Sequence, residues 1–231
     1  MELTPPIQEI NYTRTHRLIP SRFPPVGILN EVASPEDLTD IFELESWTND
    51  RISEELGIIE RIPPSEWVLG NPNATIIMAA FCHPRPGGSR FNDESVGAWY
   101  AALSLKTAHA EVLYHRQREL AEVGVLNTSF VMRDYVAEFK TNFHSLLARD
   151  SKFENYYDPI SYRASQELGT RLRNMGSNGI VYRSVRDPKG KCVVCFRPRQ
   201  VLNVRQGSHF EYKLSDTYPP SIHKLNSNAV S

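Results

Sequence analysis

The chain has 231 residues, of which 40% are hydrophobic and 23% charged, so it can bury a sizeable core and is not globally disordered. Its 26 Lys and Arg residues nearly balance 27 Asp and Glu residues, and a net charge of −1 argues against nucleic acid as a direct partner. The longest apolar run, residues 74–82, is too short to span a membrane, and residues 1–10 lack the pattern of a signal peptide. We therefore expect a cytoplasmic protein without a membrane partner.

The N-terminal region is rich in proline, and this density predicts an extended arm over residues 1–30. A helix is then expected from Ser34, whose side chain can cap the first turn. Pro35 suits the first helical position, and Asp37 stands three residues after the cap. The apolar residues that follow on one side predict that this helix ends between residues 50 and 54.

The next third of the chain contains short segments. Residues 61–72 lack a regular pattern, and the apolar residues 75–81 fit either a strand or a buried helix. Proline and glycine over residues 84–88 predict a loop. Residues 99–102 are apolar apart from one tyrosine hydroxyl and are typical of the end of a strand.

A long helix is predicted from a cap at Ser104 to about Val123, with Gly124 as its stop. Its buried stripe consists of Leu105, Ala108 and Val112. Glu111 stands beside this stripe and therefore projects at the edge of the buried face. A carboxylate in that position is either costly or useful.

The second half of the chain predicts a strand over residues 129–139, a helix over 161–175, and two strands over 179–182 and 193–196. The helix stripe consists of Ala164, Leu168, Leu172 and Met175. Residues 219–231 are polar and predict a frayed tail. Together the segments predict a mixed α+β fold.

The three cysteines agree with a reducing compartment. Cys192 and Cys195 form a Cys-x-x-Cys pattern, which in other settings binds metal or acts in redox chemistry. Here both lie in a predicted strand, where positions three residues apart point to opposite faces. We therefore interpret them as buried small apolar residues and expect no metal site.

The strongest candidates for binding or catalytic residues follow one another at intervals of 10 and 11 positions. Arg90 lies in the glycine-rich segment 87–92, Tyr100 ends a strand, and Glu111 follows on the helix. A guanidinium suits phosphate, an aromatic ring suits a flat base, and a carboxylate stabilises a sugar cation, so a dinucleotide such as NAD fits all three. Each also has an ordinary interpretation, as a surface arginine, a core tyrosine or a helix-edge carboxylate. Ser184 lies in a loop and either bonds a ligand or only turns the chain.

These segments, in order, resemble the RES-domain family, named for its Arg, Glu and Ser. The matching pieces are residues 17–25, 88–92, 100–102 with Glu111, 164–169, 179–186 and 196–198. The resemblance implies a single RES domain over residues 12–212, between the arm 1–30 and a polar tail 213–231. It implies a compact β core like that of ADP-ribosyltransferases, flanked by helices.

The resemblance also assigns roles to residues. Arg17 and Arg90 would hold the phosphates of NAD, and Tyr100 would contact its nicotinamide riboside end. Glu111 would be the catalytic carboxylate, acting with Tyr100 and Arg90, and Ser184 would complete the NAD-binding pocket.

The family implies the toxin of a bacterial toxin–antitoxin pair, an enzyme that cleaves the nicotinamide–ribose bond of NAD as a phosphorylase or glycohydrolase. NAD would be the substrate, with no separate cofactor, and inorganic phosphate is one alternative co-substrate. The implied partner is an Xre-type helix-turn-helix antitoxin whose tail occupies the active site. Two alternatives are an ADP-ribosyltransferase that modifies a protein and a catalytically silent fold that binds nucleotide or antitoxin. Glu94 and Arg183 depart from the family pattern at positions expected to affect the pocket rim.

Overall fold

The computed structural model describes residues 3–23, 28–31, 34–38, 57–125, 127–148 and 150–226. Seven strands form one mixed sheet: β1 (Ile7–Pro20), β2 (Trp99–Ala102), β3 (Thr128–Ser145), β4 (Gly179–Arg183), β5 (Lys191–Cys195), β6 (Leu202–Leu214) and β7 (Ser221–Lys224). The helices whose bounds lie within the described residues are α3 (Ala74–Cys82), α4 (Leu105–Glu122) and α5 (Arg163–Asn174). The described segments also contain the 3-10 turns η1 (Ile28–Asn30), η2 (Ile59–Arg61), η3 (Pro64–Glu66), η4 (Ser151–Tyr157) and η5 (Pro198–Gln200). The predicted mixed α+β fold is confirmed.

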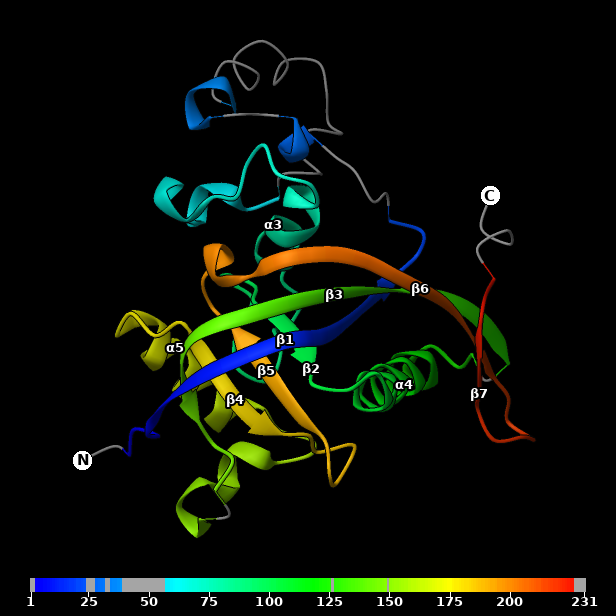
Figure 1. The fold of residues 1–231 in the computed structure, drawn as a ribbon. Coiled ribbons are helices and arrows are strands. Elements are labelled where there is room, and N and C mark those ends of the chain that lie inside the picture. Colours follow the sequence, from blue (N-terminus) through cyan, green and yellow to red (C-terminus); the bar gives the residue numbers. More distant parts are fainter. Residues whose placement is uncertain are drawn as a thin grey trace.

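The longest strand pairing in the sheet is the antiparallel pair β1–β3 (Figure 1). Its register runs from Ile7 opposite His144 to Pro20 opposite Met132. Residues 7–20 are extended, as predicted, but they belong to the sheet rather than to a free arm. The prolines flank this segment, and its interior is rich in β-branched residues that suit a strand.

Five of the strands close into a ring. The order β1-β2-β5-β4-β3 is completed by the pairing of β3 with β1, while β6 and β7 continue the sheet beyond β3. Strand β7 pairs with β6 from Ser221 to Lys224, so the prediction of a frayed tail is wrong there. A strand of four residues is recognisable only through its partner, which explains the error.

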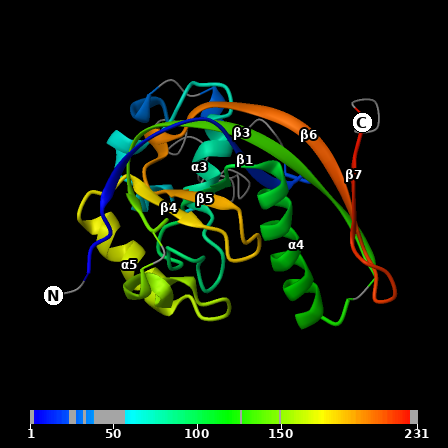
Figure 2. The same ribbon diagram turned by 60° about the horizontal axis from the view of Figure 1, so that its bottom comes forward.

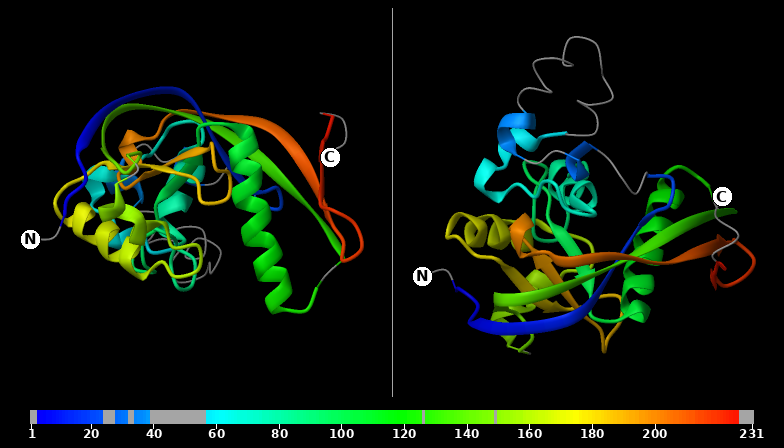
Figure 3. Two further views of the ribbon diagram at one scale, coloured as in Figure 1. Left: turned by 90° about the horizontal axis from the view of Figure 1, so that it is seen from below. Right: turned by 45° about the horizontal axis from the view of Figure 1, so that its top comes forward.

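The helices cover the sheet from two sides. Helix α3 lies on the other side of β1 and β3 from α4 (Figure 1). Helices α4 and α5 lie on either side of β4 and β5, and β6 and β7 extend beyond α4 (Figures 2 and 3). Almost every side chain of α3 is buried, which decides that the apolar segment 75–81 is a buried helix. In helix α5, Leu168 and Leu172 are buried as predicted, but Met175 lies beyond its end and is exposed.

The predicted boundaries of α4 are confirmed. The Ser104 side chain accepts the Thr107 backbone N–H, and Gly124 follows the helix with a φ of 71°. At the earlier predicted helix, Ser34 and Asp37 exchange backbone-to-side-chain hydrogen bonds as a capping box. The predicted end of that helix lies outside the described residues.

Two hydrophobic clusters form the core. One gathers α3 with residues such as Trp99 and Cys195, and the other gathers α4 and α5 with residues such as Tyr182 and Cys192. The two strand cysteines therefore lie in different clusters and are free thiols, as the strand interpretation predicted. Across the described parts of the chain, none of the helices has the length and apolar character needed to cross a membrane.

Candidate active site

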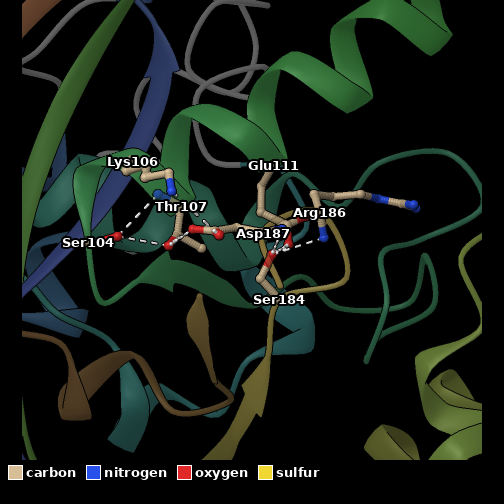
Figure 4. Close-up of polar contacts among 7 residues, drawn as sticks. All are labelled: Ser104, Lys106, Thr107, Glu111, Ser184, Arg186 and Asp187. Atoms are coloured by element: carbon tan, nitrogen blue, oxygen red, sulfur yellow. Dashed lines mark hydrogen bonds and ion pairs between the residues drawn. The ribbon is translucent and has the colours of Figure 1, made fainter. Parts of the chain in front are cut away.

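The central contact of the site joins Glu111 on α4 to Ser184 in the loop between β4 and β5 (Figure 4). The buried Ser184 hydroxyl donates to Glu111 Oε1 over 2.6 Å. Ser184 Oγ in turn accepts the backbone N–H groups of Arg186 and Asp187 at 3.0 and 2.9 Å. Because two donors fill the acceptor side of this hydroxyl, its proton is directed at the carboxylate.

Glu111 occupies the edge of the buried face that its sequence position predicted. Its Oε1 also lies 4.0 Å from the Cys192 sulfur, whereas Oε2 makes no hydrogen bond within the described residues. Burial and, next, the charge of Glu111 raise the pKa of the Cys192 thiol well above its ordinary value. The thiol is therefore neutral, and Glu111 presents an oriented carboxylate with one oxygen open to a ligand.

The pKa of the buried Tyr182 depends on three of the predicted residues. Burial raises its pKa most, and the charge of Glu111 raises it further while that of Arg90 lowers it. Tyr100 acts on it as well. The Tyr182 ring packs edge-on against Phe91, next to Arg90, with ring centroids 4.9 Å apart. Arg90, Tyr100 and Glu111 thus all act electrostatically on one buried phenol that the sequence did not single out.

The loop that carries Arg90 has a tight turn. The Ser89 N–H donates to the Asn92 carbonyl over 2.8 Å. Gly88 has a φ of +75°, and a Cβ there would lie 2.2 Å from that same carbonyl oxygen. Only glycine fits such a position without strain, so Gly88 sets the turn that presents Arg90.

Arg90 is a buried cation, 7% exposed. Its Nη1 donates to the main-chain oxygens of Tyr156 and Asp158 at 3.1 and 2.9 Å, and the guanidinium lies over the Tyr162 ring, 4.5 Å from its centroid. Nε and Nη2 donate to no group in the described part of the chain. One edge of the guanidinium is therefore fixed by the protein, and the other can bind an anion.

The hydroxyl of Tyr100 holds the loop that carries Arg90. The oxygen accepts the Phe91 N–H and donates to Asn92 Oδ1, both over 2.8 Å. Burial raises the pKa of this phenol above its ordinary value. The hydroxyl of Tyr100 is thus bound to the loop that carries Arg90, and its ring remains for the expected contact with the nicotinamide riboside end.

Arg17 stands apart from the other predicted residues. Its guanidinium lies over the Trp99 ring at 5.0 Å, and Nη1 donates to the main-chain oxygen of Tyr100 over 3.2 Å. Burial, and next the charge of Arg85, lower the pKa of Arg17 to about 10, so it stays protonated at neutral pH. Arg17 therefore hydrogen-bonds the main chain of Tyr100, and the charges of both Tyr100 and Arg85 influence its pKa.

Sequence reasoning missed the charged surroundings of His115. The pKa of His115 is lowered to about 4, first by burial and then by the charges of Arg85, Arg186 and Arg90. These three arginines come from separate segments of the chain. His115 stands four residues after Glu111 on α4, so both lie on the same face of the helix. This four-residue spacing was the signal in the sequence that could have placed His115 beside Glu111. These arginines lie near enough to His115 for their charges to disfavour its protonated form.

Comparison with known proteins places the chain in a family. It is 28% identical over 203 residues to the uncharacterized protein y4oC of Sinorhizobium fredii, which covers 87% of this chain and 83% of that protein. The solved structure of the M. tuberculosis MbcT–MbcA toxin–antitoxin complex is more distant, with a TM-score of 0.41, 16% identity, and coverage of 55% of this chain and 72% of that one. The family model of the RES domain matches residues 58–215, more than half of the chain. The protein therefore belongs to the RES-domain family.

Proposed function

We propose that this chain is an NAD-cleaving enzyme and the toxin of a toxin–antitoxin pair, with Glu111 as its catalytic carboxylate. The observation that carries the proposal is the Glu111–Ser184 hydrogen bond of 2.6 Å, which fixes one carboxylate oxygen beside Cys192 and leaves the other open. Membership of the RES-domain family supports it.

The proposed reaction breaks the bond between nicotinamide and the ribose carbon. Nicotinamide leaves with the electron pair, and positive charge develops on the ribose ring as in glycoside hydrolysis. A fixed carboxylate stabilises that charge without reorganising, which is the largest single source of catalysis in such sites. Water then gives ADP-ribose, and phosphate gives its 1-phosphorylated form.

The arginines have a matching role in this proposal. The open edge of Arg90 would bind the pyrophosphate of NAD, since a guanidinium fork matches phosphate oxygens. Arg17 and Arg85 lie close enough for the charge of one to lower the pKa of the other, and an anion between them would relieve that repulsion. The ring of Tyr100 would contact the nicotinamide riboside end.

The proposed partner is an Xre-type antitoxin. This follows from the RES-domain resemblance and from the chemistry, because an enzyme that consumes a coenzyme shared by many reactions needs a neutralising partner in its own cell. The proposed place of action is the cytoplasm, where NAD is abundant.

Incubation of the purified chain with NAD, with and without inorganic phosphate, tests the proposal. Free nicotinamide together with ADP-ribose or its phosphorylated form supports cleavage and identifies the acceptor. Transfer of label from NAD to a protein would favour an ADP-ribosyltransferase instead. NAD binding without release of nicotinamide would refute the enzymatic proposal and leave a binding fold.

A further inference from the structure

The loop that holds Ser184 is itself tied to the first turn of α4, one turn before Glu111 (Figure 4). The Thr107 hydroxyl donates to Asp187 Oδ2 over 2.8 Å. Thr107 is 1% exposed and Asp187 is 8% exposed, so the contact is almost free of solvent. A hydrogen bond to a charged acceptor in such surroundings is among the stronger ones in proteins.

The other contacts of this pair hold it in one arrangement. Ser104, the cap of α4, lies 2.8 Å from the Thr107 hydroxyl oxygen. Gly190 closes the loop by donating its N–H to the Asp187 carbonyl over 2.8 Å. A Cβ on Gly190 would stand 2.5 Å from Thr107 Cγ2, so the loop packs against Thr107 with no room for a side chain.

Asp187 connects this contact to the candidate catalytic group. Its backbone N–H donates to Ser184 Oγ over 2.9 Å, and Ser184 Oγ donates to Glu111 Oε1 over 2.6 Å. The chain of contacts therefore runs from the start of α4 into the loop and back to the same helix one turn later. It closes a small circuit in which the position of Ser184 relative to Glu111 depends on the Thr107–Asp187 bond.

We infer that Thr107 and Asp187 are positioning residues, which hold the 184–190 loop so that Ser184 orients the Glu111 carboxylate. The inference rests on the proposed function of Glu111 and assigns neither residue a contact with the substrate. A displacement of a catalytic group by about 1 Å costs on the order of 100-fold in rate, so loss of this bond should lower turnover without removing Glu111.

Thr107→Val is the direct test, because valine keeps the shape of threonine and removes the hydroxyl. We expect kcat for nicotinamide release to fall by about 10- to 100-fold while KM for NAD changes by less than about threefold. Thr107→Ser keeps the hydroxyl and should restore kcat to within about threefold of the wild type. Lys106→Gln is the matched control, since Lys106 also approaches Asp187, at 4.0 Å, but its side chain is 83% exposed; it should leave kcat unchanged.

Amide hydrogen exchange of Arg186 and Asp187 gives a second readout that does not need activity, since both amides donate to Ser184 Oγ. Their exchange should accelerate at least about tenfold in Thr107→Val and stay at the wild-type rate in Thr107→Ser and Lys106→Gln. If Thr107→Val does not fold, Asp187→Ala and Asp187→Asn repeat the comparison, because asparagine keeps an oxygen that accepts the threonine proton. Wild-type kcat and exchange in Thr107→Val, or in Asp187→Ala, would overturn the inference. If the wild type releases no nicotinamide, the proposed function fails, and the exchange rates alone then decide whether the circuit holds the loop.

Discussion

The hydroxyl of Tyr100 and the side-chain oxygen of Asn92 are joined by a 2.8 Å hydrogen bond, and the same hydroxyl accepts the Phe91 N–H. Tyr100 is on strand β2, whereas Asn92 ends the turn that presents Arg90. The phenol therefore fixes the Arg90 loop to the sheet, a role distinct from contact with a ligand.

Tyr100→Phe should consequently lower the free energy of unfolding and loosen the loop that carries Arg90. Removal of the hydroxyl leaves a buried N–H and a buried amide oxygen without a partner, which costs about 1–3 kcal/mol of unfolding free energy. Chemical denaturation measures this loss, with Tyr218→Phe as the control because Tyr218 is 76% exposed. Equal stability of the two variants would show that the hydroxyl does not hold the loop.

Gly169 on α5 should tolerate no side chain. A Cβ there would stand 1.9 Å from the main-chain oxygen of Phe91, so alanine would force the helix away from the Arg90 loop. We expect Gly169→Ala to lower the unfolding free energy by about 2 kcal/mol or more, measured by thermal or urea denaturation. Its exposed neighbour on α5, Thr170, provides the control Thr170→Ala, which should stay within about 0.5 kcal/mol of the wild type. A Gly169→Ala variant as stable as this control would contradict the close packing.

Stability should fall as the pH is lowered from about 6.5 toward 4, in part because of His115. Its folded pKa is lowered to about 4 by burial and neighbouring arginines, so in this range the unfolded state binds a proton that the folded state does not. His109 and His144, whose pKa values burial also lowers, act in the same direction.

Urea denaturation at several pH values measures how much of this loss of stability comes from His115. His115→Gln should remove on the order of 1 kcal/mol of the loss between pH 6.5 and pH 4, after allowance for partial screening by solvent. His223→Gln, on the exposed end of β7, should leave the pH dependence as it is. An unchanged slope in His115→Gln would mean that this histidine titrates alike in both states.

Local signals in the sequence were enough to predict much of the fold and the place of Glu111 on its helix. The cap at Ser104, the stop at Gly124 and the position of Glu111 beside Ala108 are all set within one helix, and the structure agrees with each. The resemblance implied only that Ser184 completes the same pocket as Glu111, and their direct hydrogen bond was not predicted, since the two residues lie 73 positions apart.

Other features depend on distant partners and could not be predicted in this way. Strand β1 is recognisable as part of the sheet only through β3, which follows more than a hundred residues later. A bulge between Tyr12 and Thr15 then shifts which side chains face each core cluster, and it turns Arg17 toward Trp99. The gathering of arginines around His115 likewise comes from three separate segments.

The most direct measurement of the central claim is nicotinamide release from NAD by Glu111→Gln beside Glu122→Gln. Both replace a glutamate of α4 with a neutral side chain of the same shape, but Glu122 is paired with Arg118 and its side chain is 64% exposed. Glu111→Gln should lower turnover by about 10²- to 10⁴-fold and allow expression without an antitoxin, whereas Glu122→Gln should behave as the wild type. Turnover by Glu111→Gln close to that of Glu122→Gln would remove Glu111 from the mechanism.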